Sequence, residues 1–107
     1  MSPWLWLLAG GVAEIAWSQS IRPTDGFTRP LPTLLCLVLA IAAIYPLTRA
    51  MQQLPVGTAY AAFTGIGAAG AVGLGIVASG DPVSAPRLGA IALIVAGVIA
   101  LRATSTA

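Results

Sequence analysis

Four long apolar stretches follow one another along this chain, each bounded by proline, glycine or arginine. They cover approximately residues 3–21, 33–48, 55–78 and 85–101. Each is close to the ~17–25 residues that a helix needs to cross the hydrocarbon core of a bilayer. Continuous apolar runs favour helices, because only helices and closed barrels satisfy their backbone polar groups in lipid. The pattern therefore predicts an all-α membrane protein with four transmembrane helices.

The segments between these stretches are short and rich in capping and turn residues. Ser2 and Ser84 stand where they can cap the first and the fourth helix. Residues 22–32 (RPTDGFTRPLP) predict a loop, and the SGDP sequence at 79–82 predicts a turn. With so little chain between the spans, we expect residues 1–107 to form a single multi-pass transmembrane domain.

The composition supports a membrane location and excludes several function classes. The chain is 58% hydrophobic and 7% charged, whereas a soluble domain carries about 25% charged residues. The net charge of +2 comes from too few groups to indicate a nucleic-acid partner. The single cysteine, Cys36, can form neither an intramolecular disulfide nor a metal site. No phosphate-binding loop, metal cluster or nucleophile–base set is found, so we expect a protein that is not an enzyme and has no cofactor.

The N-terminal stretch does not have the pattern of a cleaved signal peptide. No basic residue precedes it, and no small-residue cleavage site follows it. We therefore expect the first stretch to be retained as a transmembrane helix.

The arginines divide almost evenly between the two sides of a four-span protein. Arg49 and Arg102 fall on one side, and Arg22, Arg29 and Arg87 fall on the other. Arginine excess normally fixes orientation in the membrane. The near balance indicates either dual topology, with copies inserted both ways that pair antiparallel, or a weak bias that still fixes one orientation.

Four thin helices enclose too little space for a solute path, so transport would require at least a dimer. Small residues four positions apart let helices approach closely in lipid. Gly89 and Gly97 lie on such a stripe in the fourth stretch, and Gly67 and Gly75 lie on one in the third. These stripes serve either a contact between subunits or packing within one subunit.

The only glutamate, Glu14, lies inside the first apolar stretch. A carboxylate at the bilayer centre costs roughly 2.5–3.5 kcal/mol on insertion-based scales, so such residues face protein, water or a ligand. Helical spacing places Gly11, Trp17 and Ser18 on the same face. The carboxylate can accept a planar cation through two hydrogen bonds while the Trp17 ring stacks on it. If a proton and a cation compete for this group, binding of one expels the other, which gives exchange without a nucleotide.

The third stretch offers aromatic side chains that can join this site. Tyr60 can bind the carboxylate through its hydroxyl or make an ordinary interhelical hydrogen bond, and Phe63 is either a wall of the site or core packing. The first stretch, 3–21, also has alternatives to a cation-binding role. Glu14 can make a structural hydrogen bond to another helix, and the Trp17 ring can face lipid or the core. Trp4, nearer the chain start, is expected to anchor the helix at the membrane interface.

Four segments of the chain resemble the small multidrug resistance family. They are AGGVAEIAW (9–17), DGFTR (25–29), LPVGTAYAAFTGIGAAGAV (54–72) and GVIALRATS (97–105). The resemblance extends over nearly the whole chain. It implies a four-helix subunit, an antiparallel dimer in the bacterial inner membrane, and proton-coupled export with the glutamates of both subunits at the centre.

Within this family, the sequence is similar to the guanidinium exporter branch because Trp17 follows Glu14 by three residues. The resemblance implies that Glu14 binds substrate and proton while Trp17 and Tyr60 line the site. As further lining residues we expect those at four positions: Gly11, Ser18, Ala43 and Phe63. We expect no metal ligands.

Two departures bear on selectivity. Ala43 and Phe63 stand where that branch typically has a serine and a tryptophan. The loss of two polar groups implies selectivity for larger or more apolar guanidinyl cations, or one subunit of a heterodimer with a paired family member. The sequence thus predicts a proton-coupled antiporter for guanidinium or small guanidinyl cations. The alternatives are a broader exporter of hydrophobic or quaternary ammonium cations and a non-transporting membrane scaffold.

Overall fold

The computed structural model describes residues 2–104, and in that range it contains only helices, turns and short connections. Its elements are α1 (Pro3–Ile21), the 3₁₀ helix η1 (Arg22–Thr24), α2 (Pro30–Ala50), α3 (Val56–Ala78) and α4 (Ala85–Thr104). The predicted all-α class is confirmed.

The predicted caps are formed at both helix starts. The Ser2 hydroxyl oxygen accepts a hydrogen bond from the Trp4 backbone N–H at 3.3 Å. The Ser84 hydroxyl oxygen accepts one from the Arg87 backbone N–H, also at 3.3 Å. Each serine thereby satisfies one of the free N–H groups in a first helical turn.

The first connection is shorter than the sequence indicated. Helix α2 begins at Pro30 rather than near residue 33, because proline has no N–H and is tolerated in the first turn, where that N–H lacks an intrahelical partner. The chain reverses over Asp25, Gly26 and Phe27, whose φ angles are 49°, 70° and 65°. Pro30 and Pro32, which the sequence analysis assigned to the loop, therefore lie in the first turn of α2.

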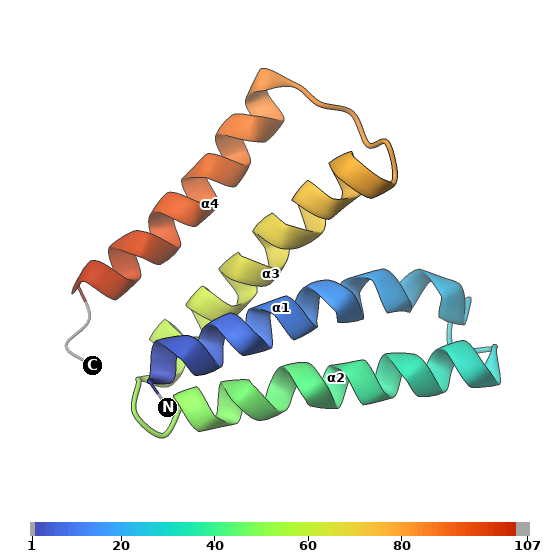
Figure 1. The fold of residues 1–107 in the computed structure, drawn as a ribbon, viewed down its shortest axis with the longest axis horizontal. Helices are drawn as coiled ribbons and strands as arrows, with labels where there is room; N and C mark the ends of the chain where they lie inside the picture. The colour runs from blue at the N-terminus through green and yellow to red at the C-terminus, as the bar shows by residue number, and fades with distance from the viewer. Residues whose placement is uncertain (1, 105–107) are drawn as a thin grey trace.

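Three of the helices, α2, α3 and α4, are long and apolar enough to cross a membrane. Helix α1 has 19 residues, which is about 28 Å at ~1.5 Å per residue. It is less apolar than the other three helices on the hydropathy scale used for membrane spans, because Glu14 and the polar residues near its C-terminus lower its mean hydropathy. It packs instead along α2 and α3 (Figure 1). The helix with the acid is thus the one best covered by protein.

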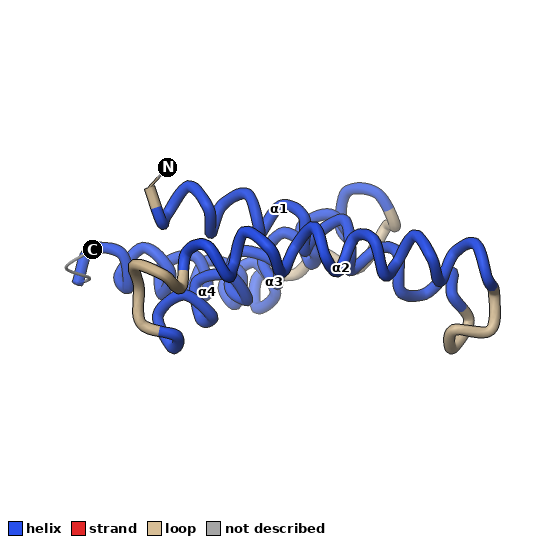
Figure 2. The backbone as a smooth tube through the Cα atoms, turned by 90° about the horizontal axis from the view of Figure 1, so that it is seen from below, coloured by secondary structure: helices blue, strands red, loops and turns tan. Residues whose placement is uncertain are grey.

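The packed part of the subunit is built from α1, α2 and α3. Its buried cluster lies toward the start of α1, and its members are Leu7, Ala43, Leu47, Ala50, Leu54, Ala59, Ala62 and Phe63. Helix α4 contacts only α3, has no buried residue and points away from α1 and α2 (Figure 1). Figure 2 shows the helices edge-on, in a subunit about 18 Å thick. Lipid or another chain must cover α4.

Glycines bring α1 against its neighbours. A Cβ built on Gly11 would lie 2.8 Å from the Ile66 Cβ, and one on Gly10 would lie 3.1 Å from the Ala43 carbonyl oxygen. By contrast, Gly89 and Gly97 of α4 have open space around them. The small residues of α1 therefore serve packing within the subunit, whereas the stripe on α4 remains free.

We predict that Gly11→Ala destabilises the subunit by about 1–3 kcal/mol, the usual effect of overpacking, because the Ile66 Cβ cannot move without shifting α3. Gly73→Ala is the matched control, since a Cβ at position 73 meets nothing within 4 Å. Unfolding of the purified protein in detergent, followed by circular dichroism, measures the difference. Equal midpoints for the two variants would contradict the packing described.

Candidate functional site

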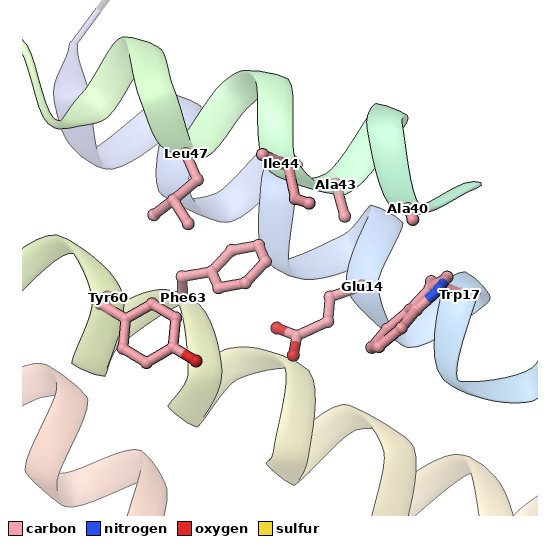
Figure 3. A pocket seen from close by; sticks show the side chains of 8 residues that line it. All are labelled: Glu14, Trp17, Ala40, Ala43, Ile44, Leu47, Tyr60 and Phe63. Carbon is pink, nitrogen blue, oxygen red and sulfur yellow. The ribbon is translucent and has the colours of Figure 1, made fainter. Parts of the chain in front are cut away.

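A cavity of about 210 Å³ lies between the first three helices. Its lining comes from all three of them, as Figure 3 shows: Glu14, Trp17, Ala40, Ala43, Ile44, Leu47, Tyr60 and Phe63. Five of these eight are residues that the sequence singled out. The cavity gathers Glu14, Trp17, Ala43, Tyr60 and Phe63 from three separate segments of the chain.

The Glu14 side chain lies against Gly67 of α3. A Cβ built on Gly67 would overlap the Glu14 carboxylate and lie 3.0 Å from its Cγ. Gly67 is itself buried. The carboxylate thus occupies the space that any other residue at position 67 would fill, which keeps it inside the protein.

One oxygen of the carboxylate, Oε2 of Glu14, is buried and has no hydrogen-bond partner among residues 2–104. A buried polar atom without a partner costs free energy, and a charged one costs more. A proton on the carboxyl group removes the charge, and a bound cation supplies a partner, so either one lowers that cost. The arrangement is therefore suited to holding one or the other.

Aromatic rings flank the carboxylate on two sides. Figure 3 shows the Glu14 carboxylate between the Trp17 indole and the Phe63 and Tyr60 rings. The rings of Tyr60 and Phe63 are stacked, with centroids 6.4 Å apart and planes inclined by 29°. Their faces are partly negative and attract cations. No hydrogen bond joins the Tyr60 hydroxyl to Glu14 within the described residues, so the two groups share the cavity without pairing.

The α2 side of the cavity is entirely apolar. It consists of Ala40, Ala43, Ile44 and Leu47, which repeat at the three- and four-residue spacing of one helix face. Ala43 is almost fully buried, with 2% of its surface exposed. The side chain at position 43 thus has no hydrogen-bonding group to offer Glu14 or a ligand.

Two of the expected lining residues lie elsewhere. Gly11 packs against Ile66. The Ser18 hydroxyl donates a hydrogen bond to the Ile15 carbonyl at 2.6 Å and lines a different cavity, together with Arg22 and Asp81. A serine within a helix can bond back to its own preceding turn in this way. Gly11 and Ser18 therefore do not line the Glu14 cavity.

Three lining residues were missed by the sequence analysis: Ala40, Ile44 and Leu47. Helix α2 is apolar on all sides, and many of its large side chains are exposed. Hydrophobic periodicity therefore does not mark its inward face. The spacing around Ala43 is the signal that would have found them, since residues three and four positions away share its face.

Comparison with known proteins identifies the family. The model of the family described as "Small Multidrug Resistance protein" matches residues 2–94. This chain belongs to the small multidrug resistance family. The resemblance noted from the four segments is thereby confirmed, and the subunit is a multi-pass membrane transporter rather than an enzyme.

Relatives within the small multidrug resistance family match almost end to end. A protein from Citrobacter freundii named "Guanidinium exporter" is 46% identical over 99 residues, which is 92% of this chain and 94% of that relative. A protein of the same name from Yersinia pseudotuberculosis is 41% identical over 102 residues, which is 95% of this chain and 98% of that relative. A third protein named "Guanidinium exporter", from Escherichia coli, is 42% identical over 99 residues, which is 92% of this chain and 94% of that relative.

We predict that a hydrophobic carbodiimide modifies Glu14 selectively, because this reagent partitions into apolar cavities and Glu14 is the only acid lining this one. Mass spectrometry of the labelled protein should find one adduct, on the α1 peptide, that disappears in Glu14→Gln and persists in Asp81→Asn. Predominant labelling of Asp81 would contradict the accessibility assigned to the Glu14 site.

Proposed function

We propose that this protein exports guanidinium or small guanidinyl cations in exchange for protons, and that Glu14 binds either the cation or a proton. The observation that carries the proposal is the Glu14 carboxylate, whose Oε2 has no hydrogen-bond partner within residues 2–104 and which is flanked by Trp17 and the stacked rings of Tyr60 and Phe63. A guanidinium ion is planar, donates parallel N–H bonds to a carboxylate and stacks on aromatic faces. Relatives 41–46% identical that are named "Guanidinium exporter" support the same substrate.

Exchange follows from the single carboxylate. A protonated carboxyl group has no negative charge to bind a cation, so a guanidinium ion must displace the proton before it binds. In the same way, a proton that binds to the carboxylate displaces the guanidinium ion. A proton gradient across the bacterial inner membrane, where we place the protein, can then drive the cation out.

The working unit that we propose is an antiparallel dimer. One subunit is too thin to enclose a path between the two membrane faces. The open stripe at Gly89 and Gly97 allows a second helix to approach closely. The near balance of arginines allows both orientations. The partner is a second copy of this chain or a paired member of the family, and it brings a second glutamate to the site.

The apolar wall on α2 favours a particular kind of guanidinyl cation. Two N–H groups of a bound guanidinium can pair with Glu14, and the partner's glutamate and the Tyr60 hydroxyl can accept others. Any N–H group directed at α2 would face Ala43 and Ile44, which accept no hydrogen bonds. Each buried unpaired donor costs about 1–3 kcal/mol. An alkyl or aryl group on the nitrogen replaces such a donor with apolar surface. We therefore propose that substituted guanidinium ions are preferred to guanidinium itself, and that quaternary ammonium ions, which lack N–H donors, are poorer substrates.

We predict that purified protein in liposomes moves protons when given guanidinium, methylguanidinium or phenylguanidinium, and that Glu14→Gln abolishes this coupled flux. Asp81→Asn, an acid outside the cavity, is the matched control and should retain flux. Proton movement is recorded with a pH-sensitive dye. Flux that requires co-expression of a second family subunit identifies a heterodimer. The absence of guanidinyl-driven flux in both preparations contradicts the proposal.

We predict that Ala43→Ser shifts selectivity toward unsubstituted guanidinium by about two- to tenfold relative to phenylguanidinium, because one added hydrogen bond is worth ~0.5–1.5 kcal/mol. Ala42→Ser is the control, since Ala42 is exposed and does not line the cavity. Competition between the two substrates in the same liposome assay measures the ratio. An unchanged ratio in Ala43→Ser would contradict the role of the α2 wall.

A further inference from the structure

A second and larger cavity, about 510 Å³, lies between α1, α3 and α4, near the start of α1 and the end of α4. Figure 1 shows these two helix ends on the same side of the molecule. The lining residues are Ser2, Trp4, Leu5, Leu8, Ile66, Val98, Ile99 and Arg102. None of them lines the Glu14 cavity, so this groove is a separate feature, and we call it the α1–α4 groove.

The walls of the α1–α4 groove are apolar and open to the surroundings. Leu5 and Leu8 on the α1 side are each about half exposed, at 53% and 52%, and Ile99 on the α4 side is 63% exposed. Helices α1 and α4 do not contact one another directly. Ile66 of α3 lines the groove with them. The α1–α4 groove therefore offers mainly apolar side chains, against which a hydrocarbon chain can pack.

One end of the groove is polar and positively charged. Arg102 stands in the last turn of α4 with an exposed guanidinium group, and the Ser2 hydroxyl lies at the start of α1. Trp4 lines the same end, and tryptophan is enriched at the level of lipid headgroups. Arginine pairs with phosphate through two parallel N–H bonds. The apolar channel therefore ends in a site complementary to a phosphate group.

We propose that the α1–α4 groove binds an anionic phospholipid, with an acyl chain along Leu5, Leu8 and Ile99 and its phosphate at Arg102. The charge at the headgroup end favours an anionic lipid of the phosphatidylglycerol type over a zwitterionic one. One basic residue near a membrane surface contributes about 1 kcal/mol toward anionic lipid, which corresponds to a preference of about fivefold.

The geometry of α4 leaves the groove free when a second chain packs on this helix. Residues of an α-helix are separated by ~100° around its axis. Ile99 therefore lies ~200° from Gly97, and Arg102 lies ~140° from it. Gly89 lies ~140° from Arg102 and ~80° from Ile99, so the open stripe at Gly89 and Gly97 is on the side of α4 away from the Arg102 end of the groove. A partner packed on that stripe leaves the groove to lipid.

The test uses the Trp4 indole as a reporter in the Trp6→Phe/Trp17→Phe variant, which retains Trp4 as its single tryptophan. Brominated phosphatidylglycerol or brominated phosphatidylcholine with the same acyl chains is added to the purified protein in mixed micelles, and quenching of fluorescence is recorded. We expect half-maximal quenching at about fivefold lower phosphatidylglycerol than phosphatidylcholine. Arg102→Gln should remove the difference, and Arg102→Lys should keep most of it.

Arg87→Gln is the matched control, because Arg87 lies at the opposite end of α4 and does not line the groove. It should keep the full preference. Equal quenching by the two lipids overturns the proposal, and so does a preference that survives Arg102→Gln. Absence of quenching by either lipid in an intact dimer also overturns it, because a second chain would then cover the groove.

Discussion

The contact between the Glu14 carboxylate and Gly67 is the interaction on which the rest of the subunit depends. An acid in the middle of a membrane-embedded helix must be kept out of lipid, because its exposure there is costly. Helix α3 makes room for it by having no side chain at position 67. The same approach of helices requires Gly10 and Gly11, which let α1 lie close to α2 and α3. Replacing Gly67 would therefore disturb both the packing of the helices and the position of the Glu14 carboxylate.

The surroundings of this carboxylate divide the site into an ionic part and an apolar part. Trp17, Tyr60 and Phe63 supply ring faces that favour a planar cation, whereas the α2 wall around Ala43 supplies no polar group. A ligand must therefore present apolar surface toward α2 and make its hydrogen bonds on the side of Glu14 and Tyr60. Helix α4 stands apart from this site, and its two sides differ. One carries the open glycine stripe, and the other forms the α1–α4 groove that ends at Arg102.

Much of this could be read from the sequence, and the failures have physical causes. The helices were predictable because their apolar runs are continuous and Ser2 and Ser84 cap two of them. The start of α2 was predicted three residues too late, because prolines such as those at 30 and 32 are typical of loops as well as of first helical turns. Glu14 stood out as the only glutamate, inside an apolar stretch, and helical spacing then placed Trp17 on the same face. Ala40, Ile44 and Leu47 were missed because α2 is apolar on all sides. Ser18, which the sequence offered as a lining residue, does not line this cavity, and its hydroxyl bonds to its own helix. Which side chains of different helices meet depends on how the helices pack, and the sequence of one helix alone does not determine that packing.

We propose that a single carboxylate, that of Glu14, holds either a proton or a guanidinyl cation. Proton release measures this most directly: phenylguanidinium is added to the purified protein in weakly buffered detergent solution while pH and bound ligand are recorded. We predict that binding releases protons, that the affinity for phenylguanidinium falls as pH is lowered, and that Glu14→Gln releases no protons. Binding that is independent of pH and releases no proton from the unmodified protein would contradict it.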